Sequence, residues 1–135
     1  MPRYMLDTNM VIYLMKHQPK EVAEKFSKCF AGDVVMSAIT YAELQYGVSV
    51  SADPGRERAN LNDLIADIPV APFDTHAAEA YGPIREATRD RKKDHLDKLI
   101  AAQAVALDVV LVTNNERDFL HYPGIKLENW LPSRE

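Results

Sequence analysis

Four of the 20 acidic residues in this chain lie where a carboxylate could do chemistry. Asp7 directly follows a short apolar run that ends at Leu6, and a second apolar stretch begins just after it. A charge at the end of a buried strand costs free energy unless a helix terminus, a cation or a metal ion satisfies it. Three further acids, Glu43, Asp97 and Asp118, stand at comparable places along the chain.

Each of the other three acids also has an ordinary structural interpretation. Glu43 ends the segment that begins at Thr40, and this spacing matches a capping box in which the glutamate reaches back to the Thr40 amide. Asp97 precedes a strongly apolar helical stretch, but it would be a surface residue if it shared a solvated edge with Lys98. Asp118 fits an acid near a helix start, where the helix dipole favours negative charge.

The four acids together indicate a metal site more strongly than any one of them does alone. Two carboxylates about 4 Å apart repel by roughly 4 kcal/mol at an effective dielectric of 20, and a divalent cation removes that repulsion. Hard oxygen ligands favour magnesium or manganese over zinc. The four histidines show no metal-ligand spacing and are expected on the surface: His17, His76, His95 and His121. The sequence therefore predicts a magnesium or manganese site, provided that the fold brings the acids together.

Alternating apolar segments indicate the elements that would position these acids. Strands are expected at 3–6, 34–36, 69–73, 109–112 and 125–127. Helices are expected at 10–15, from Pro19 to Gly32-Asp33, at 40–48 and 54–68, from Asp74 or Thr75 with a kink or break near Gly82 and Pro83, at 96–107, and as a short turn after Asn115.

Strands separated by helices at these spacings predict an α/β fold with a mainly parallel central sheet and helices on both faces. Ligands of such sheets bind beyond the carboxyl ends of the strands. Asp7 and Thr113 follow two of the strands directly, so both are expected at that edge. No linker or internal repeat divides the chain, and a single domain over residues 1–135 is expected.

Composition limits the classes of partner. The net charge is −4, so nucleic acid would have to be bound through a local basic patch. Residues 85–98 hold six basic residues against four acids, a local net charge of +2, and Arg91, Lys92 and Lys93 are its centre. A solvated helix and loop is the alternative interpretation of this segment. No stretch is apolar enough to span a membrane, and a cytoplasmic protein is expected.

Cys29, the single cysteine, is expected to pack in the core on a stripe with Val22, Phe26 and Phe30.

Four segments in order along the chain resemble the PIN-domain nucleases, and more narrowly the VapC toxins of bacterial type II toxin-antitoxin pairs. These segments are Tyr4-Met5-Leu6-Asp7-Thr8-Asn9, Ser37–Leu44 with Gly47, Leu96–Ala102, and Val112–Asn115 with Asp118-Phe119. The resemblance implies that Asp7, Glu43 and Asp97 are metal ligands. It also implies that Thr8, Asn9 and Thr113 shape the site.

Two positions depart from the family pattern. The fourth acidic position of PIN domains is Asn115 here, so Asp118 is the candidate substitute as a catalytic acid. The segment Arg91-Lys92-Lys93-Asp94-His95 replaces the family's usual turn before Asp97, which makes Asp94 a further candidate near the site.

The resemblance implies a magnesium-dependent endoribonuclease that cuts structured RNA such as a tRNA anticodon loop and so arrests translation and growth. It also implies a homodimer, a cognate VapB antitoxin, and contact with operator DNA only through the antitoxin complex. Two other functions stay open. A haloacid-dehalogenase-like phosphatase would use Asp7 as its nucleophile, but it needs a second aspartate where Asn9 stands. An RNA-binding or antitoxin-paired regulator would tolerate Asn115 in a degenerate site.

Overall fold

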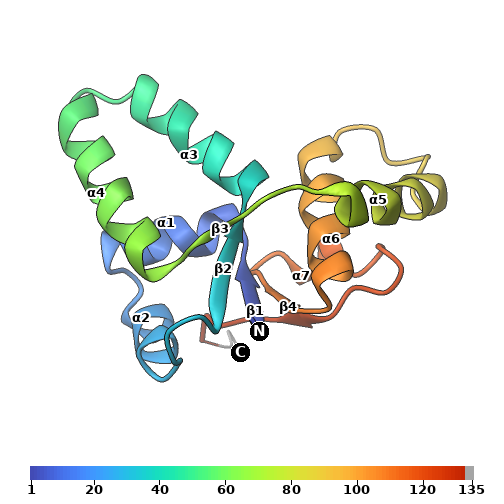
Figure 1. The fold of residues 1–135 in the computed structure, drawn as a ribbon, viewed down its shortest axis with the longest axis horizontal. Helices are drawn as coiled ribbons and strands as arrows, with labels where there is room; N and C mark the ends of the chain where they lie inside the picture. The colour runs from blue at the N-terminus through green and yellow to red at the C-terminus, as the bar shows by residue number, and fades with distance from the viewer. Residues whose placement is uncertain (133–135) are drawn as a thin grey trace.

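The computed structural model describes residues 1–132, and within them five parallel strands form one sheet in the order β3-β2-β1-β4-β5. Figure 1 shows the strands at the centre of the molecule with helices on either side. The predicted α/β fold with a parallel sheet is confirmed. The strands are β1 (Tyr4–Leu6), β2 (Val34–Ser37), β3 (Val70–Ala71), β4 (Val110–Val112) and β5 (Leu127–Glu128).

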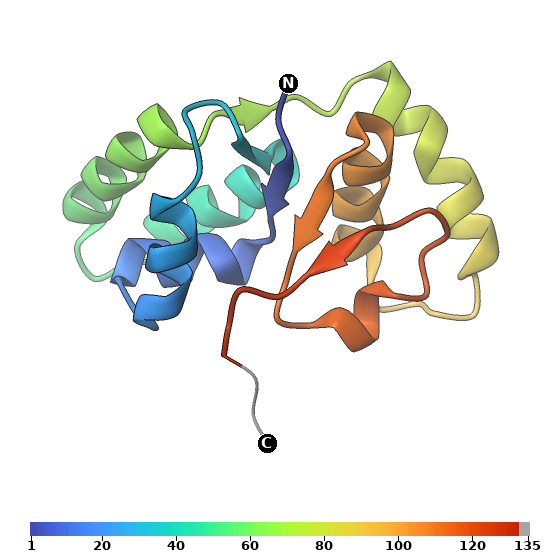
Figure 2. The same cartoon turned by 90° about the horizontal axis from the view of Figure 1, so that it is seen from below.

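Seven helices lie within the same residues: α1 (Thr8–Lys16), α2 (Lys20–Ser27), α3 (Ala38–Ser49), α4 (Pro54–Asp67), α5 (Thr75–Ala87), α6 (His95–Leu107) and α7 (Glu116–Phe119). Figures 1 and 2 show α1 to α4 grouped on one side of the sheet and α5 with α6 on the other. Over residues 1–132, every helix is too short or too polar to cross a membrane.

Strand β1 is the centre of the sheet. It pairs with β2 on one side and β4 on the other, and Leu6 is level with both Met36 and Val112. The three strands therefore end together, and the residues that follow them, Asp7 and Thr113 among them, emerge at one edge. The predicted convergence of the acids depends on this register.

Two apolar cores flank the sheet because side chains alternate across a strand. Leu6 belongs to the core beneath α1 to α4, whereas its neighbour Met5 belongs to the core beneath α5 and α6. Both side chains are fully buried. Burial of this kind stabilises a domain by about 25 cal/mol for each Å² of apolar surface, so β1 is fixed from both faces.

A buried glutamine links the helix layer to the carboxyl edge of the sheet. The Gln103 side chain, 1% exposed, accepts a hydrogen bond from Ser37 Oγ at 2.7 Å. Its amide donates to the backbone carbonyls of Ala71 and Pro72 at 2.7 and 3.0 Å. These bonds hold α6 against the ends of β2 and β3, and α6 is the helix that carries Asp97.

Two local expectations are wrong. Helix α2 ends at Ser27, so helical spacing no longer applies to the residues after it, and Phe30 is 79% exposed. Cys29 is half-buried and packs at the margin of the core. The break expected near Gly82 and Pro83 is absent, since helix α5 continues through the proline with Ala77 and Ile84 buried on either side of it.

Candidate active site

Asp7 is both a helix cap and a buried acid. Its side chain is the N-cap of α1, where Oδ1 accepts a hydrogen bond from the Met10 amide at 3.0 Å. The residue is only 5% exposed, and this burial raises its pKa. Hydrogen bonds from the Thr113 side chain and the Met10 amide lower the pKa without cancelling the effect of burial. The cap therefore satisfies only part of the charge.

Glu43 is not part of a capping box. The N-cap of α3 is Ser37, whose Oγ accepts from the Ile39 amide at 2.9 Å, so Glu43 lies beyond the reach of the helix start. Its Oε1 instead accepts a hydrogen bond from the Thr8 hydroxyl at 2.8 Å. Thr8 Oγ1 also lies 3.2 Å from Thr40 Oγ1. This contact joins the first turn of α1 to α3 and points Glu43 toward the edge where Asp7 lies.

Asp97 lies at the centre of the acidic cluster. It is in the first turn of α6, and its pKa is raised to about 6, first by burial and then by the charge of Asp7, followed by Asp118, Asp94 and Glu43. Four other carboxylates are thus close enough to disfavour its ionisation. The alternative of a solvated edge shared with Lys98 is wrong, since that lysine is 2% exposed.

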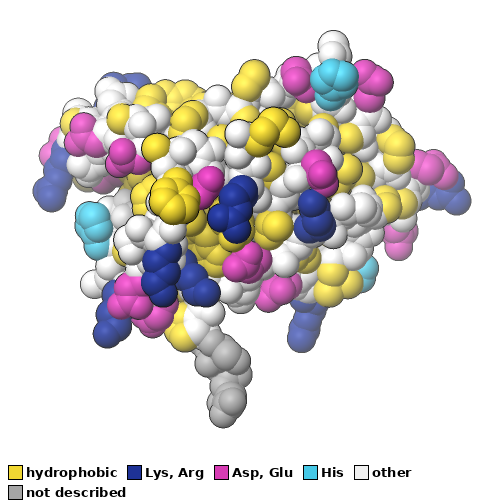
Figure 3. Space-filling model, turned by 60° about the horizontal axis from the view of Figure 1, so that its bottom comes forward, with side chains coloured by type: hydrophobic (Ala, Val, Ile, Leu, Met, Phe, Trp, Pro, Cys, Tyr) yellow, Lys and Arg dark blue, Asp and Glu magenta, His cyan; other side chains and the backbone are white. Residues whose placement is uncertain are grey.

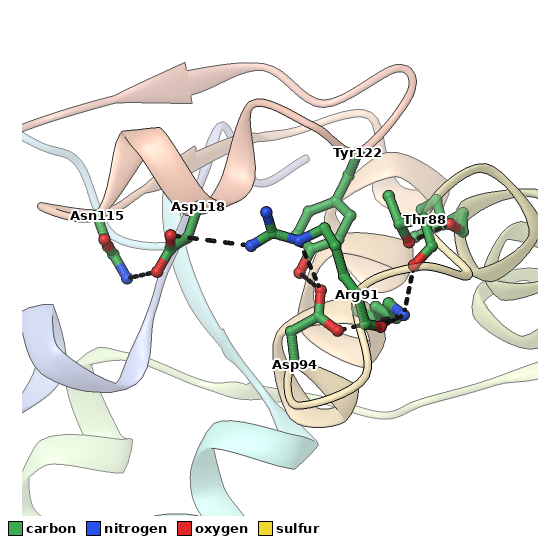
Figure 4. Close-up of polar contacts among 8 residues, drawn as sticks. Thr88, Arg91, Asp94, Asn115, Asp118 and Tyr122 are labelled. Atoms are coloured by element: carbon green, nitrogen blue, oxygen red, sulfur yellow. Dashed lines mark hydrogen bonds and ion pairs between the residues drawn. The ribbon is translucent and has the colours of Figure 1, made fainter.

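Asp118 lies beside Asp97 and is held by two neighbours. Its Oδ2 accepts from the side-chain Nδ2 of Asn115 at 2.7 Å, and its Oδ1 is 3.8 Å from Arg91 Nη2, as Figure 4 shows. A cavity of about 310 Å³ is lined by both aspartates and by the segment before α6: Arg91, Lys92, Lys93, Asp94, Asp97 and Asp118. Asn115 therefore orients an acid three residues further on, although it is not one itself.

Asp94 has a different environment from the other acids, because cations and a tyrosine surround it. Its Oδ2 accepts from the Tyr122 hydroxyl and from Arg91 Nε, and Lys98 Nζ is 3.2 Å from Oδ1. Burial raises its pKa, but these bonds outweigh burial and lower it overall. For Tyr122, burial and then Asp94 raise the pKa. The spacing from Asp94 to Lys98 could have revealed their pairing, whereas no sequence signal identifies Tyr122.

The predicted basic patch is smaller than its sequence suggested. Lys98 is buried and Arg91 is paired with acids, so among the cavity-lining cations of residues 1–132 only Lys92 and Lys93 are exposed; Arg85 and Arg89 are exposed but do not line the cavity. On the face in Figure 3, basic and acidic side chains are interspersed. Asn9 is exposed and Thr113 buried next to Asp7.

A scan against protein-family models matches the PIN domain over residues 4–125. The chain belongs to the PIN-domain family. It is 36% identical to the tRNA(fMet)-specific endonuclease VapC of Salmonella typhimurium, an alignment that covers 96% of this chain and 99% of that protein. It is 35% identical to the ribonuclease VapC2 of Haemophilus influenzae, with 97% and 100% covered. The predicted family is confirmed.

Solved structures agree with this assignment. The DNA-bound VapBC structure from Salmonella typhimurium superposes with a TM-score of 0.89 at 36% identity, covering 97% of this chain and all of that chain. The FitAcB structure from Neisseria gonorrhoeae has a TM-score of 0.79 at 26% identity, with 94% and 97% covered. The PIN fold thus spans nearly the whole chain.

PIN-domain nucleases are generally dependent on a divalent metal, and the donor set of this PIN domain fits such an ion. In residues 1–132, no lysine or arginine forms an ion pair with Asp7, Glu43 or Asp97. No cationic side chain of these residues therefore neutralises their negative charge. No group of three His, Cys, Asp or Glu side chains within that range already has the geometry to hold an ion. A divalent cation that prefers oxygen ligands fits such a set, because water molecules can complete its coordination beside the carboxylates.

Proposed function

We propose that this PIN domain is a magnesium-dependent endoribonuclease and the toxin of a VapBC-type toxin-antitoxin pair. The observation that carries the proposal is the group of acids around Asp97 at the carboxyl edge of the sheet, where burial first and then the neighbouring carboxylates raise its pKa to about 6. Relatives with 35–36% identity over nearly the full chain are named as ribonucleases or as a tRNA(fMet)-specific endonuclease. These names agree with the chemistry of the acids.

In the proposed site, Asp7 and Asp97 hold the ion and Glu43 completes its shell through water, and Asp118 occupies the fourth acidic place with Asn115 as its support. A bound divalent ion supplies charge stabilisation for a phosphodiester undergoing hydrolysis. Magnesium is the proposed ion, and manganese has the same preference for oxygen ligands.

The protein's own contribution is to hold the acids in place before substrate arrives. The Met10 amide fixes one oxygen of Asp7, and the Thr8 hydroxyl fixes one oxygen of Glu43. Because both bonds come from the first turn of α1, the two acids are oriented by a single rigid element. Asp97 has to lose its proton before it can act as a ligand, and in the metal-free protein this carboxyl is half ionised near pH 6.

The substrate approaches through exposed cations next to the acids. Lys92 and Lys93 line the cavity that also contains Asp97 and Asp118. Contacts from such side chains to phosphates position RNA without reading its sequence. We propose a structured RNA, such as the anticodon loop of a tRNA, because loop bases are accessible whereas those in an A-form stem are not.

The proposed antitoxin would cover an apolar pocket that adjoins the acids. A cavity of about 370 Å³ lies between α1, α3 and α4, and Thr8 and Glu43 form part of its wall. Its apolar lining is Ile12, Met15, Leu44, Val48 and Leu61. A VapB segment seated there would also shield Glu43, and similar chains have been solved as VapBC complexes with DNA. We propose contact with operator DNA only through that complex, and a homodimeric toxin.

The test is cleavage of total RNA by the purified protein with magnesium and then with EDTA, followed by mapping of new RNA ends. Asp7→Asn should abolish metal-dependent cleavage, because it removes a charge and keeps the shape. Asp74→Asn is the matched control, since Asp74 caps α5 with the same 3.0 Å bond from Oδ1 to a backbone amide. Full activity of Asp7→Asn would overturn the assignment.

The same assay separates the other two functions. RNA binding without cleavage would indicate a regulator with a degenerate site. Hydrolysis of a small phosphoester alone would indicate a phosphatase, which membership of the PIN family disfavours.

A further inference from the structure

Lys98 is a buried cation next to the acidic cluster, and the function proposed above gives it no role. Its side chain is 2% exposed. The ammonium donates to the backbone carbonyls of Thr88 and Arg91 at 3.0 and 2.6 Å and lies 3.2 Å from Asp94 Oδ1. The two carbonyl contacts are hydrogen bonds, and the contact to Asp94 is an ion pair that compensates the ammonium charge. A buried charge is tolerated only when it is satisfied in this way.

All three partners lie in the connection between α5 and α6, residues 88–94. Lys98 contacts the backbone of this connection at Thr88 and Arg91 and the side chain of Asp94 at its end. Asp94 is held in turn by the Tyr122 hydroxyl and by Arg91 Nε, the latter at 3.3 Å. Figure 4 shows this set of contacts extending from Thr88 to Asp118.

The fixed segment carries the exposed cations of the site. Lys92 and Lys93 lie between Arg91 and Asp94, both of which contact the Lys98 ammonium. Both lysines line the cavity of Asp97 and Asp118. Without these contacts, an irregular segment of this length would sample many conformations. Ordering it when RNA binds would then cost about 1–2 kcal/mol for each residue.

We propose that Lys98 is a positioning residue for RNA binding. Together with Asp94 and Tyr122, it holds residues 88–94 so that Lys92 and Lys93 face the RNA backbone beside the acids. The inference rests on the proposed ribonuclease function, but it concerns a residue that touches neither the metal nor the RNA.

A merely structural role predicts a different result. If Lys98 only stabilises the fold, its loss lowers stability and leaves the phosphate contacts of the folded protein unchanged. If it positions the two lysines, its loss reduces the number of counterions released on RNA binding. Each lost contact to single-stranded RNA lowers the salt slope of log K by about 0.7.

The experiment measures binding of bulk tRNA in EDTA, where no cleavage is expected, over a range of salt concentrations well below the unfolding temperature. Lys98→Met keeps the length of the side chain and removes the ammonium. We expect a roughly tenfold loss of affinity at low salt and a slope lower by about 1.4, which corresponds to two contacts. Lys126→Met is the matched control, because Lys126 likewise contacts a backbone carbonyl and a carboxylate, both of Asp108, and is exposed.

A second experiment tests whether Lys98 acts through Lys92 and Lys93. In a Lys92→Ala/Lys93→Ala protein, Lys98→Met should cause no further loss of affinity. Tyr122→Phe is the second variant and keeps the proposal testable if Lys98→Met does not fold. It removes one hydrogen bond to Asp94, keeps the ring in the core, and should lower the salt slope by a smaller amount than Lys98→Met.

The proposal is overturned if folded Lys98→Met or Tyr122→Phe binds tRNA with an unchanged slope, or if the losses of Lys98→Met and the double alanine protein simply add. Failure of the proposed function is distinguishable, because then the unmodified chain does not cleave RNA, whether or not it binds it. Cleavage by the unmodified chain together with unchanged slopes would refute the role of Lys98 alone.

Discussion

Removing the charge of Asp97 should stabilise the metal-free protein, although the residue is proposed to be essential for activity. The pKa of this carboxyl is raised from 3.8 to about 6, so the folded state holds its proton more tightly than the unfolded state does. The ionised carboxylate therefore destabilises the fold above pH 6. That penalty disappears as the pH falls through 6 toward 3.8.

The magnitude follows from the same shift. One pKa unit corresponds to about 1.4 kcal/mol, which sets an upper limit of about 3 kcal/mol for Asp97. The side chain is only partly buried, and screening by water reduces the expected effect to about 1–2 kcal/mol. Asp97→Asn should raise the free energy of unfolding by this amount at about pH 7.5 in EDTA, and by about half as much at about pH 5.

Urea denaturation of the two proteins at both pH values measures the difference. Manganese should reverse the order at neutral pH, because a ligand at 100 times its Kd stabilises the unmodified protein by about 2.7 kcal/mol and the variant should bind it poorly. Asp63→Asn is the control, because Asp63 is an exposed residue of α4, and it should change the free energy of unfolding little. A destabilised Asp97→Asn protein in EDTA at neutral pH, or a gain that is the same at both pH values, would refute the reasoning.

Two further substitutions test the supports of the site. Thr8→Val removes the 2.8 Å hydrogen bond to Glu43. It should slow RNA cleavage by about tenfold to a hundredfold, because a misplaced group costs that much. Unchanged cleavage kinetics would show that Glu43 needs no support. Gln103→Leu leaves the Ala71 and Pro72 carbonyls and the Ser37 hydroxyl without their buried partner. It should lower the free energy of unfolding by about 2–4 kcal/mol in urea titrations. A change within about 0.5 kcal/mol would contradict this account.

The sequence by itself determined the α/β architecture and the edge at which the acids meet. Apolar runs separated by amphipathic helices fix the parallel order, and each run ends directly before a polar residue, as Leu6 does before Asp7. These are local patterns, and hydrophobic burial enforces them wherever the chain folds. The motifs around Asp7, Glu43 and Asp97 were readable for the same reason, since each motif is short and continuous.

Only the tertiary structure decided which charges are free and which are used internally. Lys98 and Arg91 look like members of a basic patch in sequence, yet one is buried and the other is paired with Asp94 and Asp118. The deciding partner, Tyr122, lies 28 residues from Asp94 along the chain. The energy of a charge depends on its burial and on its neighbours in space, and no local pattern encodes contacts between α6 and the segment after α7.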